Sequence, residues 1–218
     1  QHLELGFEEA AIHARTGETD GLRLPRADLV ALAEVRAAGG PVAVHAGRAS
    51  DIRHAVDLLR DLGLRPVVLG GAEAWRVAEH LAAADVPVLR APLDNLPSSY
   101  DTLGARLDNA ALLEAAGVRV GFMERSGHYV RELRQYAGNA VAHGMSRAGA
   151  LAALTSVPAT VWGLRDHGRI EAGAAADLAI WTGDPFELTE WAETVIVDGR
   201  VVPHDSRQQR LQERYREP

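Results

Sequence analysis

The chain has 218 residues, of which 47% are hydrophobic and 24% are charged, and its formal net charge is −7. This length and composition suffice for a substantial core in one large or two small globular domains. The acidic balance argues against a nucleic-acid partner. No apolar run approaches the roughly 18 residues of a transmembrane helix, so we expect no membrane partner either. Cysteine is absent and all 23 basic residues are arginine, which excludes disulfides and lysine-dependent chemistry within these residues.

The first part of the chain predicts alternating helices and strands. A polar, turn-rich entry precedes one helix near residues 28–38. Four later segments then combine a turn with a short, mostly Val-rich run, which is typical of strands buried on both faces. They are residues 38–45, 64–69, 85–90 and 117–122. Helical patterns follow these segments at 50–62, 72–84, 106–116 and 130–143, the first capped by Ser50 or Asp51. This alternation favours parallel strands with helices outside, in either an open sheet or a barrel.

The pattern changes after residue 144. Residues 146–154 predict another helix with Ser146 as its cap, and a short helical turn follows up to Gly163. Strand patterns then occupy 168–171, 176–181 and 194–202, and the pair Asp198-Gly199 in the last of them is typical of a hairpin. Residues 205–218 are polar and predict a frayed helix or a disordered tail.

Four strand–helix units are too few for a closed architecture. A barrel of this type needs eight strands, and a lone parallel sheet would leave its edges and one face uncovered. We therefore expect more protein or a partner chain to complete the fold. The chain also begins with Gln1 rather than Met, so we expect residues upstream of it, and the localisation stays open.

Several segments resemble the amidohydrolase superfamily. Residues 109–118 (NAALLEAAGV) look like the segment before its last barrel strand. Residues 150–159 (ALAALTSVPA) and 168–178 (GRIEAGAAADL) are similar to its ALxAxTxxPA and GxIExGxxADL signatures. Residues 183–185 (GDP) and 195–200 (VIVDGR) resemble its closing strands. The order and spacing are kept over roughly residues 41 to 203, and the imidazolonepropionase-like metal-dependent hydrolases are the most similar group.

The resemblance implies an α/β fold: the second half of a (β/α)₈ TIM-type barrel, followed by the C-terminal strands of a small β-sandwich. On this reading residues 1–165 form the barrel half, 166–204 the sandwich strands and 205–218 a polar tail. The implied activity is a metal-dependent hydrolase in which water attacks an amide or related C–N bond. The implied cofactor is a divalent metal, zinc in the first instance, with one ion favoured over two.

The resemblance also indicates site residues. His45 matches the metal ligand at the end of the fifth barrel strand. The ligand expected on the sixth strand is missing, because Gly70 stands there in 70–74 (GGAEA). The carboxylate expected on the eighth strand is not evident, and Glu124 or His128 are the candidates for the catalytic base. Arg48 and Arg131 are candidates for binding the substrate; a bridge between loops is the structural alternative for Arg48.

A second hypothesis follows from the missing ligands: a catalytically degenerate barrel that acts as a binding or scaffold protein. A third and weaker one is an open flavodoxin-like sheet that binds a small anion, but it does not explain the later strands.

The expected partners are a small-molecule substrate, the missing N-terminal half or a partner chain, and a second copy of the chain in a homo-oligomer. The loop 95–100 is long enough to reach over a pocket that contains His45.

Overall fold

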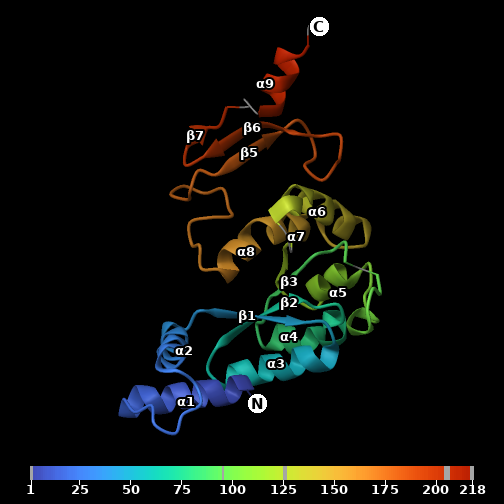
Figure 1. Cartoon of the computed structure of the whole chain (residues 1–218). Helices are drawn as coiled ribbons and strands as arrows, with labels where there is room; N and C mark the ends of the chain where they lie inside the picture. Colours follow the sequence, from blue (N-terminus) through green and yellow to red (C-terminus); the bar gives the residue numbers. More distant parts are fainter. Residues whose placement is uncertain (1, 95, 125–126, 204–206, 217–218) are drawn as a thin grey trace.

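The computed structural model describes residues 2–94, 96–124, 127–203 and 207–216. Four strands form a parallel sheet in the order β1-β2-β3-β4, which is also their order in the chain (Figure 1). They are β1 (Pro41–Ala46), β2 (Arg65–Gly70), β3 (Val88–Arg90) and β4 (Val120–Phe122). The register pairs His45 with Leu69, Leu69 with Leu89, and Leu89 with Gly121. The predicted mixed α/β fold with a parallel sheet is thus confirmed.

Helices connect the strands and continue after the last one. The bounds are α3 (Ala49–Asp61), η1 (Ala74–Val77), α4 (Ala78–Ala83), η2 (Tyr100–Thr102), α5 (Asn109–Ala115), η3 (Gly127–Glu132), α6 (Leu133–Ala142), α7 (Arg147–Leu154) and α8 (Ser156–Val161). The segment predicted as one helix over 72–84 is split between η1 and α4. The helix predicted from 106 begins at Asn109, after a turn in which Arg106 and Asp108 pair at 2.6 Å.

Two helices precede the sheet: α1 (His2–Thr16) and α2 (Arg26–Ala38). The second confirms the helix predicted near 28–38, and it ends at Gly39, whose φ of 59° is left-handed. The first was not predicted. Phe7 of α1 is 2% exposed and belongs to a buried cluster with Leu59, Leu62 and Leu64 around the end of α3. Helix α1 therefore buries its apolar face on residues far away in the sequence.

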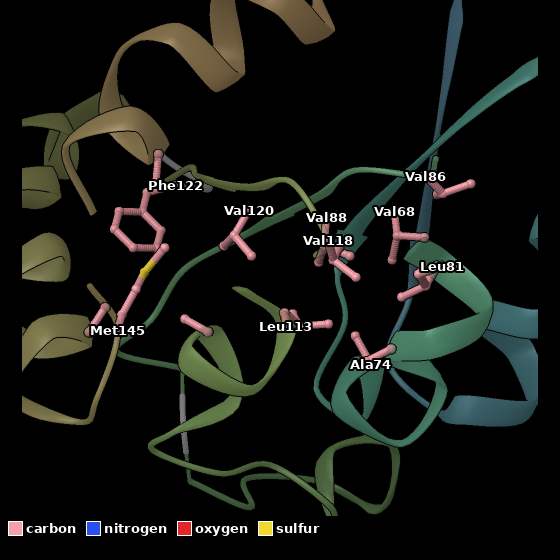
Figure 2. Close-up of a cluster of buried hydrophobic side chains, with 14 of the residues drawn as sticks. Val68, Ala74, Leu81, Val86, Val88, Leu113, Val118, Val120, Phe122 and Met145 are labelled. Atoms are coloured by element: carbon pink, nitrogen blue, oxygen red, sulfur yellow. The ribbon is translucent and has the colours of Figure 1, made fainter. Parts of the chain in front are cut away.

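The main core lies between the sheet and the helices that follow its strands. Figure 2 shows side chains of the strands and helices converging, among them Val68, Val88 and Val120 of the sheet and Leu81 and Leu113 of the helices. The labelled cluster extends to Phe122 and Met145 at its other end. Burying an aliphatic side chain of this size stabilises the fold by about 1.5–3 kcal/mol. The core thus fixes the strands whose ends form the site.

The opposite face of the sheet has a smaller buried cluster. Val67 and Leu89 pack there with Val161 of α8, and Leu69, Met123 and Val157 lie against them. Since successive residues of a strand point to opposite faces, Val67 and Val68 serve different clusters. Helix α8 therefore covers part of this face.

A separate antiparallel sheet follows, made of β5 (Leu178–Trp181), β6 (Ala192–Val197) and β7 (Arg200–Val201), and α9 (Arg207–Arg214) ends the chain. Asp198 and Gly199, with φ of 50° and 72°, form the predicted hairpin turn between β6 and β7. Residues 168–171, predicted as a strand, are irregular. Gly168 there has a φ of 80°, which a strand does not adopt. Within the described ranges, no helix has the length and apolar character needed to cross a membrane.

Candidate active site

A cavity of about 450 Å³ lies at the carboxyl ends of the first three strands of the parallel sheet. Its walls include His45, Gly47, Gly70, Arg90, Asp94 and Asp101. The carboxyl ends of parallel strands are where α/β enzymes of both the barrel and the open-sheet type bind their ligands. We call this the strand-end cavity.

Another cavity, of about 310 Å³, lies at the opposite end of the sheet and includes Arg65, Asp85 and Arg119. Arg119 is paired there with Asp85 at 3.0 Å, and Arg65 donates to the Gly39 carbonyl at 2.7 Å. These side chains fasten loops at the amino ends of the strands. Because barrel enzymes hold their active sites at the carboxyl ends of the strands, the strand-end cavity is the better candidate for the site.

His45 is the next-to-last residue of β1 and its side chain is exposed toward the strand-end cavity. The preceding residues explain its position: Val42 and Val44 pack against the cluster around α1 and α3, so the alternate residues Ala43 and His45 face the other side of the sheet. The sequence thus located His45 at the end of a strand correctly. Its predicted role as a metal ligand remains a prediction.

The end of β2 carries backbone groups rather than a ligating side chain. Gly70 and Gly71 have φ of 88° and 63°, a conformation that favours glycine. The Gly71 amide donates to the Ala46 carbonyl at 2.9 Å, which ties the ends of β1 and β2 together. Asn109, fully buried, donates from Nδ2 to the carbonyls of Gly71 and Ala72 at 2.9 and 3.0 Å. The sequence did not indicate this role of Asn109.

Arg90, the last residue of β3, was also missed. It lines the strand-end cavity, yet it is only 2% exposed. Burial lowers its pKa to about 10, and the negative charge of Asp94 opposes that shift only in part. Arg90 is therefore a protonated cation at neutral pH. The only sequence signal was an arginine that ended an apolar run, VPVLR, at residues 86–90.

Arg48 binds the loop that closes one side of the cavity. Its Nη2 lies 2.9 Å from Oδ1 of Asp101 and donates to the Tyr100 carbonyl at 3.4 Å. A Cβ on Gly47 would lie 2.7 Å from the Asp101 carbonyl oxygen, so the loop approaches β1 closely. Asp94 and Asp101 on either side of the loop line the cavity together with His45. The loop predicted to reach over the pocket was 95–100; the residues on either side of it line the cavity, whereas residues 96–100 do not, and residue 95 lies outside the described residues.

Glu73, in the segment 70–74, and Trp75, which follows that segment, support the same loop. Oε2 of Glu73 accepts a hydrogen bond from the Ala49 amide at 3.1 Å and so caps α3, in place of the predicted Ser50. Asp51 lies in the first turn of that helix. Trp75 donates from Nε1 to the Gly104 carbonyl at 2.9 Å. These residues hold the loop and the helix rather than line the cavity.

The remaining predicted site residues lie at the other edge of the sheet. Glu124 follows β4, is half-buried, and accepts a hydrogen bond at Oε2 from the hydroxyl of Tyr136, which is buried. His128 and Arg131 lie in η3 and are exposed. Three strand spacings separate the ends of β1 and β4, which is about 14 Å along the sheet. Glu124 is not among the described residues that line the strand-end cavity with His45.

The described residues do not by themselves fit a complete metal site. No group of three or more His, Asp or Glu side chains suited to a metal ion occurs among them. His45 offers one imidazole, Gly70 offers no side chain, and the cationic Arg90 forms part of the same wall. A catalytic zinc ion needs about three protein ligands. The described residues of the strand-end cavity therefore do not supply three such ligands as a group.

Comparisons with known proteins agree with the geometry. The model of a family described as "Amidohydrolase family" matches residues 130–203. Over 92 residues the chain is 40% identical to "Amidohydrolase tasK" of Hapsidospora irregularis. The matched segment is 39% of this chain and 9% of that protein. The crystal structure of an amidohydrolase from Thermotoga maritima MSB8 matches with a TM-score of 0.81 and 25% identity over 93% of the chain.

Residues 130–203 match the amidohydrolase family, and the chain is similar to solved amidohydrolases. It spans 55% of the length of the Thermotoga amidohydrolase. An uncharacterized metal-dependent hydrolase from Pyrococcus furiosus has the same fold, with a TM-score of 0.56 at 19% identity over 78% of the chain and 40% of its own length. The predicted resemblance to the amidohydrolase superfamily is thus confirmed. The chain spans 55% and 40% of the lengths of these two solved structures.

Proposed function

We propose that the protein is a metal-dependent hydrolase of the amidohydrolase type, in which water attacks an amide or a related C–N bond of a small molecule. One observation carries this proposal: in a chain similar to amidohydrolases, His45 is the next-to-last residue of a parallel strand and faces a cavity at the carboxyl edge of the sheet. That edge is where barrel enzymes hold their catalytic groups.

We further propose that the chain is the second half of a (β/α)₈ barrel with the last strands of a β-sandwich. Four parallel strands in chain order and a later three-stranded antiparallel sheet support this division. Residues 1–165 would then form the barrel half, 166–204 the sandwich strands and 205–218 the tail. The other strands would come from an N-terminal half or from a partner chain, and homo-oligomers are compatible with this arrangement.

The proposed roles follow from the positions of the side chains. His45 would be one ligand of a single divalent metal, zinc in the first instance, with its other ligands outside the described residues. Such a metal would lower the pKa of a water molecule and polarise a carbonyl group. Glu124 or His128 would accept a proton, and Tyr136 orients the Glu124 carboxylate by its hydrogen bond to Oε2. Arg48 and Arg131 would contact the substrate from the loops.

The test uses the complete gene product, purified and analysed for bound metal. We expect close to one zinc ion per chain and release of free amine from at least one compound in a panel of N-acyl amino acids, dipeptides and lactams. The variant His45→Ala should lose most of the metal. His54→Ala is the matched control, because His54 is exposed on α3 and should leave the metal content unchanged.

Unchanged metal content in His45→Ala would refute the assignment of His45. A complete gene product that binds no metal and hydrolyses nothing in the panel would refute the proposed function. That result would favour the catalytically degenerate barrel instead.

A further inference from the structure

A second cavity, at the amino ends of the parallel strands, has a charged rim and an apolar wall. It is the cavity of about 310 Å³ that includes Arg65, Asp85 and Arg119, and we call it the strand-start cavity. Its volume is at the lower end of the range for small-molecule sites. The proposed reaction takes place at the opposite end of the sheet, so that reaction leaves the strand-start cavity without a role.

The wall of the strand-start cavity is apolar where the strands begin. Pro41 is the first residue of β1, Pro66 is the second residue of β2, and Pro87 directly precedes β3. Proline has no N–H group, so each of these positions offers a ligand an apolar ring in place of a hydrogen-bond donor. Buried aliphatic side chains complete this part of the wall: Leu64, Val67, Val86 and Val161. Such a wall suits the apolar body of a ligand.

The rim carries three positive charges and one negative charge among the described residues that line the cavity. Arg119 donates from Nη2 to the Asp85 carbonyl at 2.9 Å and lies 3.0 Å from the Asp85 carboxylate. Arg65 donates from Nε to the neutral Gly39 carbonyl at 2.7 Å. The third arginine, Arg60, is exposed in the last turn of α3, and no ion pair or side-chain hydrogen bond joins it to the described residues. One aspartate thus faces three guanidinium groups.

The guanidinium groups retain donors for a ligand. A guanidinium has five N–H donors on three nitrogens, and the contacts of Arg65 and Arg119 use one nitrogen each. Its parallel N–H groups match the two oxygens of a carboxylate. A bound anion would also reduce the mutual repulsion of the three cations on the rim.

We propose that the strand-start cavity binds a small carboxylate with a flat apolar body, such as an aromatic acid. Its carboxylate lies toward Arg60 and Arg119, and its ring lies against the three prolines. An apolar wall with a few charged groups at one side is the arrangement expected of a site for a ligand that has both parts. This site is separate from the strand-end cavity and does not depend on the proposed hydrolase function.

The experiment measures binding by calorimetry to the complete, purified protein. Benzoate is the probe, benzamide is its neutral counterpart of nearly the same size and shape, and acetate is an anion that lacks the ring. We expect benzoate to bind at least about 10-fold more tightly than either of the others, because each lacks one of the two contacts.

Two variants test the rim of the cavity. Arg60→Met and Arg119→Met should each weaken benzoate binding about 10-fold or more, and Arg60→Lys should keep part of the affinity because it keeps the charge. Arg53→Met is the matched control, since Arg53 is exposed on the same helix but does not line the strand-start cavity. If Arg119→Met does not fold, Arg60→Met decides, because Arg60 is exposed and its replacement removes no buried contact.

No binding of benzoate at millimolar concentration would overturn the proposal and would mean that the arginines only fasten the strand starts. Equal binding of benzoate and benzamide, or of benzoate and acetate, would also overturn it. So would an unchanged affinity in Arg60→Met, or an equal loss in Arg53→Met. Benzoate binding that is lost in His45→Ala and kept in Arg60→Met would place the probe in the strand-end cavity and contradict this site.

Discussion

Arg48 and Asp101 are 53 positions apart in sequence, yet their side chains meet at 2.9 Å and join the start of α3 to the loop beside the strand-end cavity. The Arg48 side chain is half-exposed and that of Asp101 is largely exposed, so the pair contributes little to global stability. Its effect is local, because it holds a loop that lines the cavity. The first two predictions concern this loop and the residues beneath it.

We predict that Arg48→Met loosens the loop 96–104 without unfolding the protein. Hydrogen exchange of that loop should become measurably faster, whereas the unfolding free energy should fall by no more than about 1 kcal/mol. Exchange is measured by mass spectrometry on peptides that cover the loop. Arg53→Met, on an exposed position of the same helix, is the control and should leave the loop unchanged. A loop with unaltered exchange in Arg48→Met would contradict the proposed tether.

We predict that Asn109→Leu destabilises the protein by about 1–3 kcal/mol, because the change removes the buried side-chain donor to the carbonyls of Gly71 and Ala72. The Gly71 carbonyl keeps only its hydrogen bond from the Ala74 amide. Urea unfolding followed by circular dichroism measures the loss. Gln135→Leu removes an amide from an exposed position of α6 and should cost much less. Equal losses in the two variants would mean that the buried hydrogen bonds of Asn109 contribute little.

The parallel sheet could be predicted because its signal is local. Each strand is a short apolar run bounded by turn residues, and the strand ends follow from the run itself. His45 could be located at the end of a strand for the same reason. Helix α1 could not be predicted, because its buried face is defined by Leu59, Leu62 and Leu64, which only the folded chain brings to Phe7.

The residues of the candidate site also differ in how far their roles could be predicted from the sequence. Arg90 and Asn109 appear in the sequence as an ordinary arginine and an ordinary asparagine, and their roles arise from burial, which depends on tertiary packing. Glu124 and His45 were proposed together from a family pattern, yet the sheet order separates their strands by two others. Residues 168–171 have the alternation of a strand but form none, because Gly168 adopts a positive φ.

We predict that Leu113→Ala destabilises the protein by about 2–5 kcal/mol. Leu113 is fully buried between α5 and the sheet (Figure 2), so truncation removes apolar contacts and leaves a cavity. The loss is measured by urea unfolding at constant protein concentration. Leu151→Ala, at a half-exposed position of α7, should cost well under half as much. A loss below about 1 kcal/mol for Leu113→Ala would contradict the described core.

The last prediction concerns pH and the contact between the helices and the loop before β6. Asp184 in that loop forms an ion pair with Arg147 of α7 and accepts a hydrogen bond from the Phe186 amide. The hydrogen bond from Arg147 and the one from Phe186 lower the pKa of Asp184 below its ordinary value. An aspartate with a lowered pKa stabilises the folded state above its unfolded pKa of about 3.9, and this contribution is lost as the pH falls through the lowered value.

The wild type should therefore be more stable than Asp184→Asn at pH 7, and the difference should shrink steadily below about pH 4. Urea unfolding of both proteins between pH 7 and pH 2 measures it. Asp20→Asn is the control, because Asp20 is exposed in the turn before α2 and its substitution should give no such pH-dependent gap. A difference between wild type and Asp184→Asn that stays constant down to pH 2 would show that the ion pair with Arg147 does not stabilise the folded chain. The protonated carboxyl and the neutral amide are alike in charge, so the two proteins should converge where Asp184 is fully protonated.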